Sequence, residues 1–204
     1  MHMSEHITPQ LILQGYCIGI FPMADEDGCI YWYSPDPRCI LEFDRLRVPR
    51  SLRQTIRRAT FEIRLDTAFD EVIAACADRP EGTWISPQIM SVYRELHRRG
   101  FAHSVEAWRQ GELVGGLYGV TIGGAFFGES MFHHVPNASK VALVALMDHL
   151  QRQGFVLVDT QWSTPHLLHF GAVETPREQY LERLSQAVQL ACTFSQPPAP
   201  PTDA

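Results

Sequence analysis

The stretch AHSVEAWRQGELVGGLYGVTIGGAFFGESMF, residues 102–132, decides the fold. Two turn signals, Gln110-Gly111 and Gly123-Gly124, separate its apolar runs. Short turns that contain glycine join neighbouring antiparallel strands. The stretch therefore predicts a meander of three antiparallel strands.

Helices and further strands are expected on both sides of the meander. The segment before it, TWISPQIMSVYRELHRRG, predicts a helix that Ser86 caps and Gly100 ends, with Pro87 at its first position. In the C-terminal helix, Thr175 is expected as the cap and Glu178 as the residue that closes a capping box. The other helices are expected at 8–16, 49–58, 68–77, from Asn137 or Ser139 to 153, and at 164–170, and the other strands at 29–33, 39–43, 61–65 and 155–162.

This order of elements predicts an α+β fold with a central, mostly antiparallel sheet flanked by helices. The two prolines of SPDPR, residues 34–38, form a stiff connector. They predict a boundary between a small N-terminal domain, 1–36, and a larger domain, 37–192. The chain ends in SQPPAPPTDA, which has the composition of a disordered tail, so a tail is expected at 193–204.

The composition is that of a globular protein. Of the 204 residues, 45% are hydrophobic and 20% are charged. No apolar run reaches the roughly 18 residues of a membrane helix, and the first residues lack the basic and apolar regions of a signal peptide. We therefore expect a soluble, cytoplasmic protein that acts as a monomer.

Neither the cysteines nor the histidines form a metal motif. The five cysteines contain no CxxC pair, which fits reduced thiols. The pairs His133-His134 and His166/His169 carry ligating groups, but no HExxH or His/Cys cluster accompanies them. No metal is expected.

An arginine-rich segment contrasts with the net charge of −6. It reads RLRVPRSLRQTIRRATFEIR from Arg45 to Arg64, with seven arginines and one acid, Glu62. A guanidinium donates two parallel hydrogen bonds to a phosphate, so the segment suits a docked contact with a few phosphates of a nucleic acid. A solvated helix face is the alternative, and the charge alone leaves both open.

The end of the meander, FFGESMF, places the carboxylate of Glu129 in an apolar run. A buried acid without a partner is costly, and the usual outcome is a shifted pKa or a bound cation. We expect Glu129 to meet either a basic residue of this chain, such as Lys140, or a cation from outside.

Two more polar residues stand at the end of a predicted strand, in FVLVDTQW. Residues two apart in a strand face the same side, so Asp159 and Gln161 are expected to touch, with the acid orienting the amide. The alternative is an acid that caps the next helix. On the helix after NASK, apolar residues recur at i, i+3, i+4 and i+7, a pattern that usually marks core: Leu143, Leu146, Met147 and Leu150.

The element order is that of acyltransferases that carry an acetyl group from coenzyme A. Those enzymes need a glycine-rich turn at a helix start to hold the pyrophosphate. The corresponding helix here begins PNASKVALVAL and has no such turn. The sequence therefore predicts an acyltransferase-like body with a different donor.

Eight motifs between about Gly15 and Tyr180 carry a resemblance to a known family: GYCIGIFPM, YWYSPDPR, GTWIS, AHSVEAW, LVGGLYGV, FFGESMF, NASKVAL and LVDTQW. In order and spacing they resemble the leucyl/phenylalanyl-tRNA–protein transferase family. The resemblance implies a small N-terminal domain joined to a GNAT-like C-terminal domain, one similar to the acyl-CoA N-acyltransferases. It implies transfer of Leu or Phe from aminoacyl-tRNA to the N-terminal α-amino group of proteins that begin with Arg or Lys. This marks them for proteolysis, and neither a metal nor a cofactor is implied.

The resemblance also implies roles for particular residues. It makes Asp159 and Gln161 the reaction centre, and it places Glu129 at the substrate site and Trp84 against the terminal adenine of the tRNA. Further substrate-site positions are Tyr16 and Tyr93, and the apolar pocket for the Leu or Phe side chain is formed by Leu117, Phe126, Leu143, Leu146, Leu150 and Val158. The acceptor stem of the tRNA would lie on Arg45, Arg47, Arg50, Arg53, Arg57 and Arg58.

Two departures from the family pattern concern the N-terminal part. Met23 follows GIFP, where the family often has an aromatic residue, so one side of the adenine site is expected to be softer. The N-terminal domain is expected to be shortened relative to the family. Two other functions remain as alternatives: a coenzyme A-dependent N-acetyltransferase and a non-catalytic tRNA-binding module.

Overall fold

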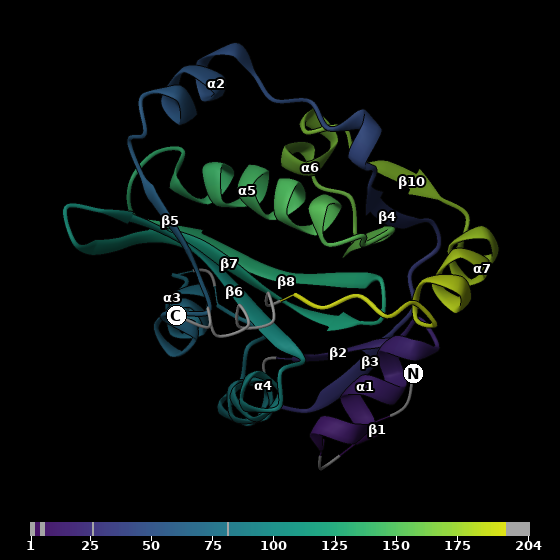
Figure 1. The fold of residues 1–204 in the computed structure, drawn as a ribbon. Helices are drawn as coiled ribbons and strands as arrows, with labels where there is room; N and C mark the ends of the chain where they lie inside the picture. The colour runs from purple at the N-terminus through teal and green to yellow at the C-terminus, as the bar shows by residue number, and fades with distance from the viewer. Residues whose placement is uncertain (1–2, 5–6, 26, 81, 195–204) are drawn as a thin grey trace, which may run out of the picture.

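The computed structural model describes residues 3–4, 7–25, 27–80 and 82–194. At its centre is a seven-stranded sheet in the order β10-β4-β9-β8-β7-β6-β5 (Figure 1). Neighbouring strands are antiparallel except β8 and β9, which run parallel. The strands are β4 (Arg38–Leu41), β5 (Glu62–Leu65), β6 (Ala102–Arg109), β7 (Glu112–Ile122), β8 (Ala125–His133), β9 (Leu157–Gln161) and β10 (Val173–Thr175). The predicted α+β fold and the three-stranded meander are confirmed.

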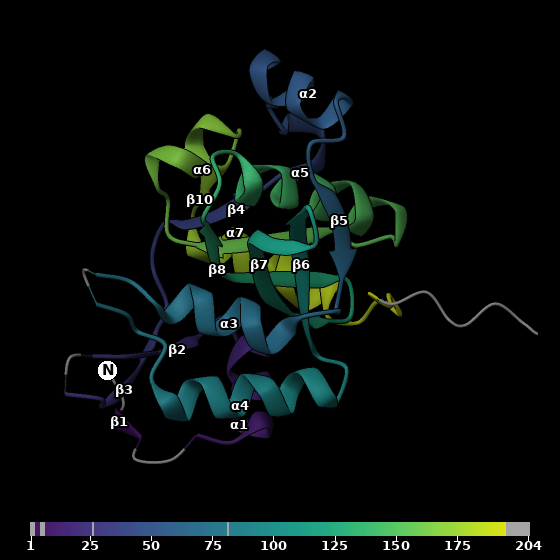
Figure 2. The same cartoon turned by 90° about the vertical axis from the view of Figure 1, so that its left-hand side faces the viewer.

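Helices cover both faces of this sheet (Figures 1 and 2). On one face lies α5 (Ala138–Arg152), with α2 (Arg50–Arg57) beyond it, and on the other face lie α3 (Phe69–Ala77) and α4 (Pro87–Arg98). Each face has its own buried hydrophobic cluster. Phe126 belongs to the cluster under α5 and Phe127 to the cluster under α3, because neighbours in a strand point to opposite faces.

The N-terminal part adds a helix and a second sheet to the α3 and α4 side. The helix is α1 (Pro9–Cys17), and the three strands, β1 (Met3–Ser4), β2 (Phe21–Ala24) and β3 (Ile30–Tyr33), pair in the order β1-β3-β2. Ile12 and Tyr16 of α1 are fully buried in the same cluster as Ile73 of α3 and Tyr93 of α4. The remaining elements are η1 (Phe43–Arg45), α6 (Pro165–His169) and α7 (Arg177–Ala187).

The start of the C-terminal helix corrects a prediction. Thr175 does not cap α7, since it is the last residue of β10 and pairs there with Arg38. Pro176 takes the cap position without a side-chain hydrogen bond, so no capping box forms. The helix predicted from Asn137 or Ser139 to 153 is confirmed as α5, with Asn137 at its cap position in a left-handed conformation (φ of 72°) and without a side-chain cap bond. Ser86 caps α4 as predicted, and its hydroxyl accepts from the Ile89 N–H at 3.3 Å.

The beginning of the predicted tail is also corrected. Phe194 is buried and stacks on the ring of His103, with 4.2 Å between ring centroids. Its carbonyl oxygen accepts a hydrogen bond from His149 Nε2 at 2.7 Å. The chain is therefore packed as far as 194, and the rest of the predicted tail, 195–204, lies outside the described residues.

Candidate active site

Strands β8 and β9 run side by side for three residue pairs and then part. Residues 125–127 of β8 pair with residues 157–159 of β9, and beyond them the two strands no longer pair. Each strand carries an irregularity just past this point. On β8 the pairing with β7 skips Glu129, and on β9 the pairing with β4 skips Thr160. A bulge of this kind redirects side chains, so consecutive residues of both strands can face the gap.

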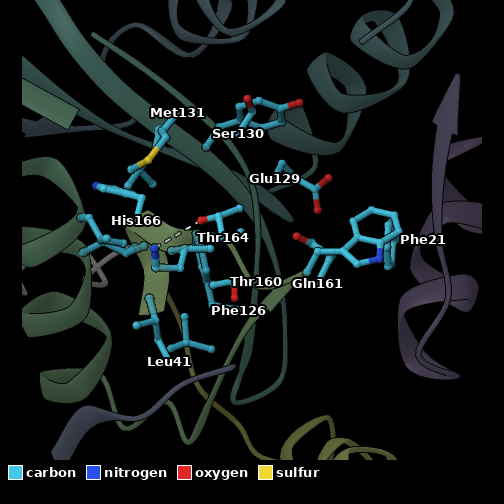
Figure 3. Close-up of a pocket in the computed structure, with 18 of the residues that line it drawn as sticks. Phe21, Leu41, Phe126, Glu129, Ser130, Met131, Thr160, Gln161, Thr164 and His166 are labelled. Atoms are coloured by element: carbon cyan, nitrogen blue, oxygen red, sulfur yellow. Dashed lines mark hydrogen bonds between the residues drawn. The ribbon is translucent and has the colours of Figure 1, made fainter. Parts of the chain in front are cut away.

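The gap between the parted strands is a pocket of about 370 Å³ (Figure 3). In Figure 3, Leu41 and Phe126 lie on one side of it and Phe21 on the other, with Glu129 and Gln161 between. Of the residues predicted for the site, nine line the pocket: Met23, Trp84, Leu117, Phe126, Glu129, Leu143, Leu146, Val158 and Gln161. The structure therefore brings nine of the thirteen residues predicted for catalysis and substrate binding onto one continuous surface.

Glu129 is half-buried and is held by two tyrosines. Tyr16 Oη donates to Oε1 of Glu129, Tyr93 Oη donates to Oε2 at 3.2 Å, and the two hydroxyl oxygens lie 2.6 Å apart. Within the described part of the chain, no Lys or Arg forms an ion pair with Glu129, so the alternative of pairing with Lys140 is wrong. Burial raises the pKa of Glu129 to about 8, against the opposing effect of the tyrosine hydrogen bonds. The site holds a carboxyl group that still lacks a cation.

Asp159 is completely buried and bound to Arg38 through both carboxylate oxygens. Arg38 donates from Nε to Oδ1 at 2.8 Å and from Nη2 to Oδ2 at 2.6 Å, and Tyr180 Oη donates to Oδ2 at 2.7 Å. Oδ1 also accepts the backbone N–H of Gln161 at 2.9 Å. The acid therefore fixes the main chain of Gln161, and the prediction that it orients the amide side chain is wrong. The capping alternative is wrong as well, because Thr164 caps α6.

Gln161 ends β9 in a left-handed backbone conformation, with a φ of 59°. Such a conformation is uncommon outside glycine, and such residues are often found at functional sites. The side chain lines the pocket, and its amide nitrogen is buried without a hydrogen-bond partner. A buried polar group without a partner calls for an explanation, and a bound ligand supplies one.

Four predicted residues do not reach the pocket lining. Tyr16 and Tyr93 are fully buried and act on the pocket through Glu129. Asp159 acts through Gln161 in the same way. Leu150 is fully buried in the cluster under α5 and is not among the lining residues, which corrects the prediction that it forms the pocket wall.

The predicted tRNA-binding arginines lie outside the pocket, on η1, on α2 and next to them. All six are exposed. Arg53 Nε donates to the Val48 carbonyl oxygen at 3.0 Å, and in the described chain none of the six has a salt bridge. Their charge is free to meet a partner, as both the phosphate interpretation and the solvated-face interpretation require.

Sequence reasoning missed several residues of the pocket and its support. Trp162 is 41% exposed in the lining and meets Phe21 edge-on, with 4.9 Å between ring centroids. It stands directly after Gln161, so its position in DTQW was an available signal. Arg79 and His166 also line the pocket; the sequence marked His166 only as one of a pair of histidines, and no local pattern marks Arg79. The support of Asp159 by Arg38 joins residues far apart in the chain, which no local pattern shows.

Comparison with known proteins gives the family. Residues 40–185 match the protein-family model described as leucyl/phenylalanyl-tRNA protein transferase, and residues 5–36 match the model of the N-terminal domain of the same proteins. The chain belongs to the leucyl/phenylalanyl-tRNA protein transferase family. The resemblance found in the eight motifs is therefore confirmed.

Curated relatives agree with this family over nearly the whole chain. The leucyl/phenylalanyl-tRNA–protein transferase of Herpetosiphon aurantiacus is 56% identical over 94% of this chain and 100% of its own length. That of Gloeobacter violaceus is 53% identical over 92% of this chain and 97% of its own length. Among solved structures, L-PGS from Bacillus licheniformis is similar at 11% identity and a TM-score of 0.43, over 65% of this chain and 49% of that one.

Membership of the transferase family makes this chain an aminoacyltransferase, as the motifs predicted. It decides against the coenzyme A-dependent acetyltransferase and against the non-catalytic module. In the part of the chain that the structure describes, no helix has the length and apolar character needed to span a membrane. Nor do the described residues bring three or more His, Cys, Asp or Glu side chains together as a metal site.

Proposed function

We propose that this transferase moves Leu or Phe from aminoacyl-tRNA to the α-amino group of proteins that begin with Arg or Lys, and that the pocket between β8 and β9 is where it does so. The observation that carries the proposal is the make-up of this pocket. An apolar wall meets a carboxyl group and an amide nitrogen for which the described residues supply no cation and no hydrogen-bond partner, respectively. These are the complements of an apolar side chain, a cationic amine and an ester carbonyl.

The apolar wall is the proposed site of the donor's Leu or Phe side chain. Its residues come from the sheet and from the middle of α5, and they include Leu117, Phe126, Leu143, Leu146 and Val158. A hydrophobic pocket separates side chains that differ by one methylene by only about 1–3 kcal/mol. Rejection of the β-branched Ile and Val therefore depends on the shape of this wall.

Trp84, Met23 and Trp162 are proposed to surround the terminal adenosine of the donor. All three line the same pocket as Glu129. Stacking of a base on an aromatic side chain is worth roughly 1–3 kcal/mol. The two tryptophans can supply this contact, and Met23 offers a flexible apolar surface beside them.

Glu129 is the proposed site of the acceptor's positive charge. Its carboxyl group is bound by two hydroxyl donors and lacks an internal cation. A cation that binds there favours the ionised form and so lowers the pKa that burial has raised. Binding of an N-terminal Arg or Lys is thereby coupled to ionisation of this one residue.

The proposed reaction is aminolysis of an ester. The amine nitrogen forms a bond to the carbonyl carbon, and the bond from that carbon to the ribose oxygen breaks. The nitrogen loses a proton and the ribose oxygen gains one. An α-amino group has a pKa near 7.7–8.0, so roughly a tenth of it is already neutral at pH 7. The ester is already activated, so neither a metal nor ATP is required.

Gln161 is proposed to hold the reacting groups. Its unpartnered amide nitrogen can donate to the carbonyl oxygen, where negative charge develops during the attack. The Arg38–Asp159 pair holds the main chain of Gln161 and so keeps the amide in place. Positioning of this kind lowers the barrier by several kcal/mol.

Four further features belong to this proposal. The exposed arginines of η1 and α2 contact phosphates of the tRNA acceptor stem. Residues 1–36 and 37–192 form two units, in agreement with the separate family matches at 5–36 and 40–185. The larger unit is GNAT-like, supported by a mostly antiparallel sheet whose parallel pair parts around the pocket. A charged-tRNA donor places the reaction in the cytoplasm.

A transfer assay tests the function. The protein is mixed with Leu-tRNA or Phe-tRNA and with peptides that begin with Arg, Lys, Asp or Ala. We expect the Arg and Lys peptides to gain one residue and the Asp and Ala peptides to gain little. Equal use of all four peptides would overturn the proposed acceptor, and tRNA binding without any product would overturn the transfer itself.

A further inference from the structure

Arg79 places a guanidinium group in the lining of the pocket. The residue follows α3, in the loop that leads to α4, and it is exposed. Its Nε donates to the Cys76 carbonyl oxygen at 3.1 Å, and its Nη2 donates to Ser130 Oγ at 2.8 Å and to the Met131 carbonyl oxygen at 3.2 Å. All three acceptors are neutral. No carboxylate among the described residues forms an ion pair with it.

These hydrogen bonds connect Arg79 to both parts of the proposed substrate site. Ser130 directly follows Glu129 in β8, next to the bulge that turns Glu129 toward the pocket. The loop that carries Arg79 also carries Trp84 into the same pocket. The guanidinium is therefore bonded to the residue that follows Glu129, and it stands on the same loop as Trp84.

A fixed positive charge here conflicts with the acceptor taken alone. A protein that begins with Arg or Lys brings a cationic side chain and an α-ammonium group to the pocket. Like charges at short range repel, so Arg79 disfavours this acceptor unless an anion accompanies it. The donor carries such an anion next to its reacting end, since a phosphodiester joins the terminal adenosine to the preceding nucleotide.

We propose that Arg79 binds the phosphodiester on the 5′ side of the donor's terminal adenosine, and that this contact also relieves repulsion of the cationic acceptor. The proposal rests on the proposed function. Arg suits the task because its planar fork donates to two phosphate oxygens at once. The bonds to Cys76, Ser130 and Met131 hold the fork in advance, so less side-chain freedom is lost on binding.

This site is distinct from the arginines of η1 and α2. Those six lie outside the pocket and meet whichever phosphates reach the surface of α2. Arg79 lies in the pocket lining and would meet only the phosphate nearest the ester. A donor with a single phosphodiester should therefore be long enough to contact Arg79, whereas the arginines of η1 and α2 require a longer piece of the tRNA.

Short donors provide the test. Phenylalanyl-adenosine has no phosphate, and phenylalanyl-CpA has one. Both are assayed with an Arg peptide and with wild type, Arg79→Met, Arg79→Lys and Arg152→Met. Arg152 is an exposed arginine of α5 paired with Asp148, so its variant controls for the loss of one positive charge elsewhere.

We expect Arg79→Met to lower kcat/KM for phenylalanyl-CpA about tenfold, the size of one lost charged hydrogen bond. Its kcat/KM for phenylalanyl-adenosine should stay unchanged or rise, because the repulsion of the acceptor is gone. Arg79→Lys should fall between the two, and Arg152→Met should match wild type with both donors. Unreactive CpA and adenosine can also be tested as competitive inhibitors. In Arg79→Met the inhibition constant of CpA should rise about tenfold, and that of adenosine should not change.

If Arg79→Met lowers kcat/KM equally with both donors, the proposal is overturned. Arg79 would then only hold its loop against β8. If Arg79→Met does not fold, Arg79→Lys and the inhibition constants decide between the same two outcomes. Wild type that transfers from neither donor nor from full tRNA would overturn the proposed function itself, and the proposal with it. Activity with full tRNA but no preference for phenylalanyl-CpA over phenylalanyl-adenosine would overturn only the phosphate site.

Discussion

At the scale of single residues, the two carboxyl groups of the site differ in whether the described residues supply a cationic partner. Asp159 forms an ion pair with Arg38, and its carboxylate oxygens also accept hydrogen bonds from Tyr180 Oη and from the Gln161 N–H. Glu129 has two hydroxyl donors and, among the described residues, no cation. A buried charge is stable only when it is paired, so Asp159 is complete within the fold and Glu129 is not. The sequence showed that both positions were unusual, but it could not show which of the two lacked a partner.

Replacement of Glu129 by Gln should weaken the use of cationic acceptors. The amide keeps the shape of the side chain and removes its charge. A hydrogen bond to a charged group contributes about 1.5–3 kcal/mol, so kcat/KM for Arg peptides should fall roughly ten- to a hundredfold. The preference for an Arg over an Ala peptide should shrink with it. The measurement is that ratio in Glu129→Gln and in Glu182→Gln, an exposed acid of α7. An unchanged ratio would show that Glu129 does not bind the cation.

The same variant should change how stability depends on pH. Burial raises the pKa of Glu129 from 4.5 to about 8, so between these values the native protein binds more protons than the unfolded chain. The free energy of unfolding then falls as pH rises, by at most about 1.4 kcal/mol per unit from this group. Glu129→Gln removes the effect, so its stability relative to wild type should increase from pH 5 to pH 8. Melting curves recorded across this range check it, and parallel curves for the two proteins would contradict it.

Replacement of Gln161 by Ala should slow the chemical step. Loss of a donor aimed at the developing charge costs kcat, so turnover should fall at least tenfold while tRNA binding changes little. Single-turnover kinetics and a tRNA-binding assay on one preparation separate the two effects. Gln179→Ala, at an exposed position of α7, is the control. Wild-type turnover in Gln161→Ala would remove the role assigned to the amide.

At the scale of elements, the signals that succeeded are local and the failures are not. The turns at Gln110-Gly111 and Gly123-Gly124 fall between the strands of the meander, as predicted. The strands β1 and β10 were missed because they have two and three residues, too few for a pattern, and β2 was missed because it contains Pro22 and lies in a turn-rich stretch. The expected contact between Asp159 and the Gln161 amide failed for another reason, since the irregularity at Thr160 breaks the alternation of β9. Such irregularities depend on the neighbouring strand and leave no local trace.

Element α2 gives a prediction about the whole tRNA. Arg53→Ala combined with Arg57→Ala should weaken binding of every charged tRNA alike and flatten the salt dependence, because phosphates carry no sequence information. Transfer from phenylalanyl-adenosine should not change. The matched control is Arg98→Ala with Arg99→Ala, which removes two exposed charges from the end of α4. If the short donor loses as much activity as full tRNA, α2 is not the tRNA site.

At the scale of the whole molecule, Arg38 joins parts that are far apart in the chain. Its Nη1 donates to the Gly19 carbonyl oxygen at 3.0 Å, and its other nitrogens hold Asp159 of β9. The guanidinium carbon also lies 4.7 Å from the Phe21 ring centroid and 4.6 Å from that of Tyr180. The N-terminal part, the central sheet and α7 thus meet at one fully buried cation. Through Asp159 the same cation holds the main chain of Gln161. The residue that connects these parts of the fold therefore also supports the proposed site.

The last prediction tests whether Arg38 stabilises the fold through its ion pair with Asp159 or through its other contacts. Arg38→Met leaves the carboxylate of Asp159 buried without its cation, and breaking a buried pair in this way costs about 3–5 kcal/mol. Asp159→Asn added to Arg38→Met removes the stranded charge. Its one amide oxygen can still accept the Gln161 N–H in the place of Oδ1, and its NH2 group can donate to the Tyr180 hydroxyl in the place of Oδ2. The double variant should therefore be more stable than Arg38→Met alone, as urea unfolding of wild type, both single variants and the double variant will show. If the double variant instead loses as much free energy of unfolding as the two single variants together, Arg38 stabilises the fold through Gly19 and the aromatic rings. If pairing dominates, the double variant should still transfer slowly, because the Gln161 main chain is then held by a neutral amide in place of a carboxylate.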